Sequence, residues 1–199
     1  AKPPGVSQRG SIPPDFGQSL EKLDAPVARF PGLRPAAVVA LLMDDGELDS
    51  PDLVLIERSS SLRSHAGQLA FPGGKPEPGD DSLVHTALRE ANEEVGLPVE
   101  QTDVLGRLSP VPTPTGFIIV PFVAWAPSGW TPQRTSPEVE QVLTPSMSML
   151  SDPSVHRITG RGVWKGFRYE MHEFAIHDPP LWGATARMVW DLLERIRGE

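Results

Sequence analysis

The chain has 199 residues, of which 39% are hydrophobic and 22% charged, as in an ordinary globular protein. Its formal net charge of −8 argues against nucleic-acid binding, which normally needs a basic surface; an anionic ligand would need local cations or a metal ion. The absence of cysteine excludes disulfides and thiolate chemistry, and it fits a cytoplasmic location. No apolar run reaches the roughly 18 residues of a membrane span, so we expect no membrane partner.

Residues 1–16 are rich in Pro, Gly and Ser, a composition typical of a flexible segment, and they begin an arm that extends to residue 30. Within this arm, residues 17–29 predict a short helix with Leu20 and Leu23 on one face. No repeat or linker divides the rest of the chain, so we assign residues 1–30 to the arm and 31–199 to a single domain.

Short apolar runs and turn residues predict the remaining elements. Residues 36–43 and 53–57 are expected to be neighbouring strands, and residues 68–71 a third strand ended by Pro72-Gly73-Gly74. We further expect strands at 103–108, 117–125 and 138–143, a helix start at Thr144-Pro145, a hairpin within 161–176, and a last helix over 184–197.

The strongest helix prediction covers residues 82–95. Asp80, Asp81 or Ser82 can cap its start, and Gly96 stands where a helix stop is expected. The apolar face that would pack on the sheet consists of Val84, Ala87, Leu88, Ala91 and Val95.

Another face of this helix carries Glu90, Glu93 and Glu94, at positions i, i+3 and i+4. Like charges at this spacing repel each other, and a hard cation such as Mg²⁺ or Mn²⁺ would relieve the repulsion. Three glutamates alone are more often a solvated acidic face. Gly73-Gly74, which precedes the helix, favours a metal site instead. Glycine lets the backbone approach a ligand closely, so a free carbonyl there could join the glutamates around a hard cation.

The segment GGKPEPGDDSLVHTALREANEEVGL resembles the Nudix box, G-x5-E-x7-R-E-U-x-E-E-x-G-U, where U is a bulky aliphatic residue. Two features depart from the pattern. Ala91 is small for its position, and Asp80 replaces the first glutamate, with eight residues instead of seven before Arg89. The resemblance implies an α+β Nudix fold, an α/β/α sandwich with a mixed central sheet, and a pyrophosphohydrolase that needs Mg²⁺ or Mn²⁺.

A second segment, LIERSSSLRSHAGQLAFPGG, has the spacing R-S-x3-R-x3-G-x3-F-P-G-G. It resembles the coenzyme A pyrophosphatase branch of the Nudix hydrolases, as do VLGRLSPVPTPTGFIIVPFV and LWGATARMV further along. This resemblance implies cleavage of coenzyme A and its derivatives to 4′-phosphopantetheine and 3′,5′-ADP.

The resemblance also implies roles for individual residues. The metal ligands would be Glu90, Glu94 and the Gly74 carbonyl, with Glu93 as a further ligand. The catalytic residues would be Glu93, Glu94, Arg89, which orients the glutamates, and Glu138, an alternative general base. The substrate would contact Arg58, Arg63, His65 and Gly73, although the two arginines could instead pair with surface acids.

Three alternatives stay open. The substrate could be another nucleoside diphosphate, such as ADP-ribose, a dinucleotide or a capped RNA end. The chain could also be an inactive Nudix module that binds a nucleotide, although such a module is expected to have lost its glutamates. The expected partner is a small molecule, not nucleic acid, and a homodimer is left open. We assign no role to His156, His172 or His177.

Overall fold

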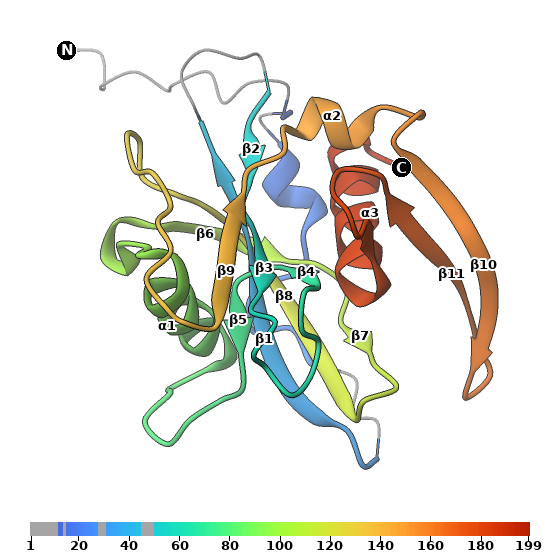
Figure 1. The fold of residues 1–199 in the computed structure, drawn as a ribbon, viewed down its shortest axis with the longest axis horizontal. Helices are drawn as coiled ribbons and strands as arrows, with labels where there is room; N and C mark the ends of the chain where they lie inside the picture. The colour runs from blue at the N-terminus through green and yellow to red at the C-terminus, as the bar shows by residue number, and fades with distance from the viewer. Residues whose placement is uncertain (1–11, 14, 28–30, 45–49) are drawn as a thin grey trace.

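The computed structural model describes residues 12–13, 15–27, 31–44 and 50–199. Figure 1 shows a central sheet between two helices, α1 (Leu83–Val95) and α3 (Gly183–Arg197). Each helix contributes to its own hydrophobic core on one side of the sheet. The predicted α+β fold, an α/β/α sandwich around a mixed sheet, is confirmed.

The central sheet has the strand order β2–β1–β8–β6. These strands are β2 (Asp52–Leu53), β1 (Arg34–Met43), β8 (Phe117–Trp125) and β6 (Asp103–Arg107). β1 and β8 run parallel, whereas β6 is antiparallel to β8. Two short strands extend the sheet: β5 (Gly73–Gly74) pairs with β1, and β7 (Val111–Pro112) pairs with β8.

Strand β1 shows why the sequence has continuous apolar runs. Ala37, Val39 and Leu41 pack with α1, whereas Ala40 and Leu42 pack in the core on the α3 side. A strand covered on both faces needs apolar residues at every position instead of an alternating pattern.

Two small sheets flank this centre. The first has the order β4–β3–β9, formed by β4 (Leu69–Ala70), β3 (Leu55–Arg58) and β9 (Val139–Leu143). The second has the order β10–β11–β12, formed by β10 (His156–Trp164), β11 (Phe167–Phe174) and β12 (Leu181–Trp182). The short helices are α2 (Met147–Ser151) and the 3₁₀ turns η1 (Phe16–Ser19) and η2 (Val99–Gln101).

Several predicted elements need correction. The run at 53–57 is split, because β2 pairs with β1 while β3 joins a separate sheet. The strand predicted at 68–71 is only two residues long, and Gly73–Gly74 forms a strand of its own instead of only ending one. Helix α2 is capped by the Ser146 side chain, not by Thr144-Pro145.

Helix α1 closely follows its prediction. Ser82 is the N-cap and its Oγ accepts a hydrogen bond from the backbone N–H of His85. Gly96 ends the helix in the left-handed conformation, with φ of 71°. Ala87, Leu88, Ala91 and Val95 are buried, as the apolar face predicted.

The segment before β1 packs against the domain. Residues 15–27 contain no α-helix, so the helix predicted at 17–29 is wrong for the described positions; residues 28–30 lie outside them. Phe16, on the 3₁₀ turn, is only 4% exposed and belongs to the core that contains α3.

A buried arginine on β6 holds this segment in place. Arg107 is 2% exposed, and its guanidinium donates to Glu21 Oε2 at 2.6 Å and to the Ala25 carbonyl at 2.8 Å. The backbones of Glu21 and Arg107 also exchange two hydrogen bonds. A buried cation is tolerated only when paired, so the segment and β6 depend on each other.

We expect Glu21→Ala to lower the free energy of unfolding by about 2–3 kcal/mol, because it leaves the Arg107 charge buried without its carboxylate. Breaking a fully buried pair typically costs about 3–5 kcal/mol, and Glu21 is partly exposed. Urea unfolding would measure the change, with Glu100→Ala as a surface control expected to stay within about 0.5 kcal/mol. Equal stability of the two variants would contradict this assignment.

Candidate functional site

The three glutamates of α1 occupy different environments. Glu94 is 3% exposed, and its Oε2 accepts a hydrogen bond from the Gly73 backbone N–H at 3.2 Å. The Glu90 side chain is 15% exposed, whereas that of Glu93 is 54% exposed. Glu90 and Glu94 therefore form the inner part of the acidic face, and Glu93 lies at its edge.

The two glycines of β5 leave room for these carboxylates. A Cβ atom on Gly74 would stand 2.6 Å from Glu90 Oε1. A Cβ atom on Gly73 would stand 2.3 Å from the Ala37 carbonyl oxygen of β1. At Gly73 any other residue would push the backbone of β1 away, whereas at Gly74 a side chain would displace the flexible carboxylate end of Glu90, so both glycines support this arrangement.

Arg89 links the glutamates to the loop that precedes the helix. Its Nε and Nη2 donate to the Asp80 carboxylate at 2.9 and 3.1 Å. Its Nη1 donates to Glu90 at 3.2 Å and to Glu93 at 3.3 Å, and Nη2 also donates to the Lys75 carbonyl. One guanidinium thus fixes two glutamates and both ends of the loop, as its predicted orienting role requires.

Asp80 is the anchor of this arrangement. Besides Arg89, it accepts hydrogen bonds from Thr86 Oγ1 at 2.8 Å and from the Glu77 backbone N–H at 2.9 Å. The Arg89 hydrogen bond is the main cause that holds the pKa of Asp80 well below its usual range. Sequence reasoning missed this role because Asp80 departs from the Nudix box both in residue type and in spacing.

Burial makes the inner carboxylates hard to ionise. It raises the pKa of Glu94 to about 8, and the negative charge of Glu90 adds to the effect. The pKa of Glu90 is raised as well, again mainly by burial. Hydrogen bonding from Gly73 and the charge of Arg58 oppose the shift of Glu94 without cancelling it. Arg89 at Glu90 and Arg58 near Glu94 therefore compensate the burial of the inner pair only in part.

Arg58 and Glu138 reach this pair from the neighbouring sheet. Arg58 ends β3 opposite Val139 of β9, and the Ser59 N–H donates to the Glu138 carbonyl at 2.8 Å. The Nε of Arg58 is buried and has no hydrogen-bond partner within the described residues. The negative charge of Glu138 also raises the pKa of both inner glutamates.

Arg63 and His65 lie in the exposed loop that connects β3 to β4. His65 has a left-handed backbone, with φ of 56°, and its Nδ1 lies 3.0 Å from Gln68 Oε1. No hydrogen bond or salt bridge joins either side chain to the α1 glutamates in the described part of the chain. The structure thus brings Arg58 to the acidic face but not these two residues.

No three carboxylate or imidazole groups converge as a complete metal site among the residues that the structure describes. Glu93 contacts Arg89 instead of joining the inner pair. The donors that fit a hard cation are the two inner carboxylates, Glu90 and Glu94, together with backbone oxygen atoms such as the Gly74 carbonyl.

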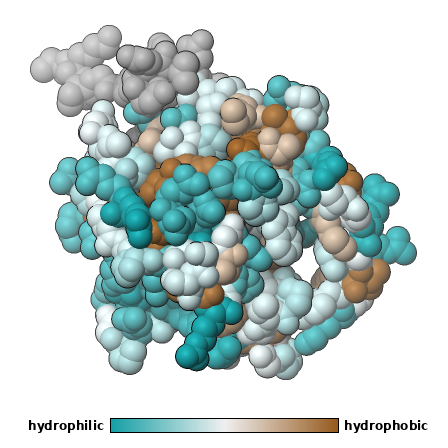
Figure 2. Space-filling view, viewed as in Figure 1, coloured by the Kyte–Doolittle hydropathy of each residue, from teal (hydrophilic) through white to brown (hydrophobic). Residues whose placement is uncertain are grey.

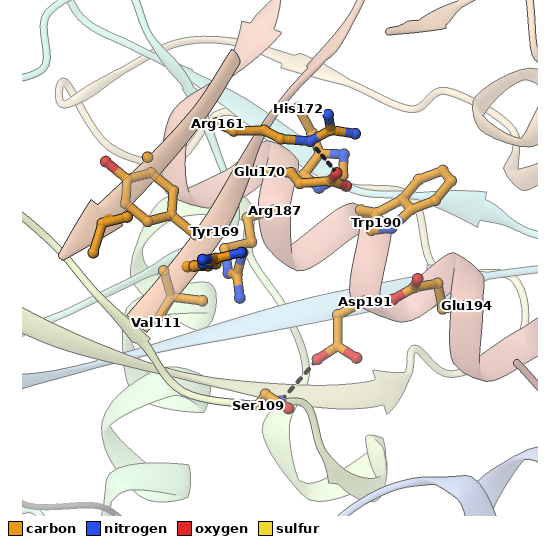
Figure 3. A pocket seen from close by; sticks show the side chains of 13 residues that line it. Ser109, Val111, Arg161, Tyr169, Glu170, His172, Arg187, Trp190, Asp191 and Glu194 are labelled. Atoms are coloured by element: carbon orange, nitrogen blue, oxygen red, sulfur yellow. Dashed lines mark hydrogen bonds and ion pairs between the residues drawn. The ribbon is translucent and has the colours of Figure 1, made fainter. Parts of the chain in front are cut away.

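A cavity of about 940 Å³ lies elsewhere, between α3 and the β10–β11 hairpin (Figure 3). Its walls include Arg161 and Glu170 of the hairpin and Arg187 and Trp190 of α3. None of the predicted site residues lines it. Beside it, His156 and His172 share a 2.9 Å hydrogen bond and stack on Trp190, which is a packing role that sequence spacing did not reveal.

No helix in the described part of the chain has both the length and the apolar character to cross a membrane.

Comparisons with known proteins agree with this geometry. Residues 32–156 match the NUDIX domain family, and this range contains the whole acidic face and β5. A Photorhabdus laumondii protein described as an uncharacterized Nudix hydrolase, NudL, is 36% identical over 148 residues, covering 74% of this chain and 78% of that protein. A Yersinia pestis NudL is 34% identical over 152 residues, covering 73% of each chain.

Among solved structures, a MutT/nudix family protein from Enterococcus faecalis aligns with a TM-score of 0.53. The alignment covers 87% of this chain and 66% of that chain at 17% identity, so it supports the fold alone. The family match, the two relatives and the glutamate helix packed on Gly73–Gly74 lead to one conclusion: the chain belongs to the Nudix family of hydrolases.

Proposed function

We propose that this Nudix hydrolase is a metal-dependent diphosphatase that cleaves coenzyme A and its derivatives to 4′-phosphopantetheine and 3′,5′-ADP. The observation that carries the proposal is the buried Glu90–Glu94 pair, packed on Gly73–Gly74 with the unpaired Arg58 Nε nearby. The narrower assignment to coenzyme A rests on the R-S-x3-R-x3-G-x3-F-P-G-G segment that begins at Arg58.

Glu90, Glu94 and the Gly74 carbonyl would hold Mg²⁺ or Mn²⁺, with Glu93 as a ligand at the edge. Burial disfavours the charged form of the inner carboxylates, so a cation beside them would restore that form. When bound, the ion would neutralise the diphosphate and lower the pKa of a bound water.

The cations around the metal site would position the substrate. Arg58 has a buried donor without a partner, and a phosphate oxygen would satisfy it. The exposed Arg63 and His65 would contact the 3′-phosphate, which a simple nucleoside diphosphate lacks. The Gly73 backbone allows the substrate to approach β5 closely.

In the proposed reaction, water attacks one phosphorus atom of the diphosphate. The bond from that phosphorus to the bridging oxygen breaks, and the other phosphate leaves with the bridging oxygen. A general base takes the proton of the water. Glu138 is a candidate because it is exposed and its charge acts on both inner glutamates, and Glu93 and Glu94 are the alternatives within the helix.

The alternatives are a Nudix hydrolase of another nucleoside diphosphate and an inactive nucleotide-binding module. The presence of all three glutamates disfavours the inactive module. A cytoplasmic location remains part of the proposal, and a homodimer stays open. The division into residues 1–30 and a domain, residues 31–199, also stays a proposal, although the described residues 15–27 pack on the domain and do not form a flexible arm.

Product identification tests the function directly. Incubation of coenzyme A with the protein and Mg²⁺ should yield 4′-phosphopantetheine and 3′,5′-ADP, as measured by chromatography and mass spectrometry. Excess chelator should stop turnover, and added Mg²⁺ or Mn²⁺ should restore it. Faster cleavage of ADP-ribose or a dinucleotide in the same panel would point to the first alternative, and turnover that persists in excess chelator would refute the metal-dependent mechanism.

Glu94→Gln should lower turnover by about a thousandfold, because a metal site supplies several kcal/mol and each 1.4 kcal/mol is a factor of ten. The variant should also change the pH dependence of stability in the metal-free protein. Since burial raises the pKa of Glu94 from 4.5 to about 8, the folded state retains a proton that the unfolded state has lost between these values. Wild-type stability should therefore fall by a few kcal/mol as the pH rises from 4.5 to 8.

A glutamine side chain does not titrate, so the Glu94→Gln variant should show a flatter stability profile over the same range, measured by urea unfolding at several pH values with chelator present. Glu100→Gln, on the exposed turn η2, is the matched control and should behave like wild type in both measurements. Near-normal turnover of Glu94→Gln would exclude this residue as a metal ligand.

Arg63→Ala should raise KM for coenzyme A by about tenfold, since a charged hydrogen bond contributes roughly 1.5–3 kcal/mol. KM for dephospho-coenzyme A, which lacks the 3′-phosphate, should change little. Steady-state kinetics on both substrates would measure the difference, with Arg157→Ala on β10 as an exposed control. An equal rise for both substrates would show that Arg63 does not contact the 3′-phosphate.

A further inference from the structure

The β10–β11 hairpin lies almost entirely beyond residues 32–156, the range that matches the Nudix domain family. A two-residue turn joins its strands, and Lys165 and Gly166 both have positive φ, 47° and 84°. Figure 1 shows the hairpin at the edge of the molecule, with α3 on one side and the turn at a free end. The turn therefore lies on the periphery of the protein.

The free end of the hairpin exposes apolar side chains. Val163 is 68% exposed and Phe167 is 61% exposed, the highest values for large hydrophobic residues in the described ranges. Val163 pairs with Arg168 across the strands and Trp164 pairs with Phe167, so the two exposed side chains lie on opposite faces of the hairpin. In Figure 2, brown patches lie among teal ones on this side of the molecule.

The same end is basic in an otherwise acidic protein. Residues 153–169 contain four of the 18 basic residues and none of the 26 acidic ones. Arg157 and Arg161 pair with acids of β11. Lys165 and Arg168 form no salt bridge with any residue that the structure describes, and Lys165 Nζ lies 4.9 Å from the Trp164 ring.

We infer that this tip, Val163–Arg168, binds the surface of membranes that contain anionic lipids. Exposed apolar side chains gain free energy by entering the region between headgroups and acyl chains, and adjacent cations are attracted to anionic headgroups. The lack of a spanning segment led us to expect no membrane partner, but surface contact needs no such segment. The net charge of −8 would repel the rest of the protein, so contact would be confined to the tip.

The observations favour a lipid surface over nucleic acid. A nucleic-acid site tracks the phosphate backbone with a groove of cations. Here two cations that form no salt bridge with the described residues lie near Val163, an aliphatic side chain that gains nothing from a phosphate backbone or a stacked base. An apolar phase would stabilise the exposed parts of Val163 and Phe167 together.

Vesicle binding tests the inference with the intact chain. Co-sedimentation should show binding to vesicles of phosphatidylcholine with added phosphatidylserine, little binding to phosphatidylcholine alone, and weaker binding as salt rises. Lys165→Glu and the double variant Val163→Ser/Phe167→Ser should each reduce binding at least tenfold. Met149→Ser, which removes a 48% exposed apolar side chain from α2, is the matched control and should bind like wild type.

Turnover of a soluble diphosphate should be unchanged in the hairpin variants, which would show that they fold. Absence of wild-type binding to anionic vesicles would overturn the inference. Equal binding of the wild type to anionic and neutral vesicles would also overturn the inference. The same holds if Met149→Ser loses as much vesicle binding as the hairpin variants. Binding of single-stranded RNA without vesicle binding would identify the tip as a nucleic-acid surface instead. These outcomes are independent of whether coenzyme A is the substrate.

Discussion

The carboxylate of Glu94 lies inside the protein, where the Gly73 N–H and the nearby charge of Arg58 stabilise its charged form. This placement depends on α1 packing on β5, where a side chain at position 73 would collide with β1 and one at position 74 would displace the Glu90 carboxylate. It also requires β5 to pair with β1, the strand that both hydrophobic cores share. The acidic face is thus held by the core of the sandwich and not by a flexible surface.

A catalytic metal site benefits from such rigidity. Two carboxylates that stay partly uncompensated in the absence of an ion would move out toward solvent if their helix could shift away from β5. The cores on both faces of β1 oppose that movement, and Arg89 fixes Glu90 from the side. The free-energy cost of burying the two inner carboxylates is therefore offset by apolar packing elsewhere in the protein, as is common where charged groups serve function.

The parts of the fold that the sequence predicted are those with local signals. Helix α1 has a capping serine, a terminal glycine and a periodic apolar face, and β8 is an uninterrupted apolar run, so both were located to within a residue or two. The division of 53–57 between two sheets was not predictable, because strand pairing depends on distant segments such as β9. The packing of Phe16 and the Arg107 ion pair likewise join residues more than eighty positions apart.

The candidate site shows the same difference between features with a local sequence signal and features that depend on contacts between distant segments. Glu90, Glu94 and Gly74 were found together because a helical turn and a glycine pair are visible in the sequence. The closeness of Arg58 and Glu138 to the glutamates rests on the pairing of β3 with β9, although a family motif pointed to both residues. The exposure of Glu93 and the anchoring role of Asp80 depend on side-chain contacts that no spacing rule encodes.

The segment from Asp80 to Arg89 shows how the Nudix box can vary in length, because it has eight intervening residues where the box has seven. Arg89 still binds the Asp80 carboxylate, so the contact between the two side chains, not the number of residues between them, is what this part of the box conserves here. Lengthening a closed loop by one residue adds little to its closure entropy. Family members with insertions here should thus escape searches that demand fixed spacing, while keeping an acid that reaches the arginine.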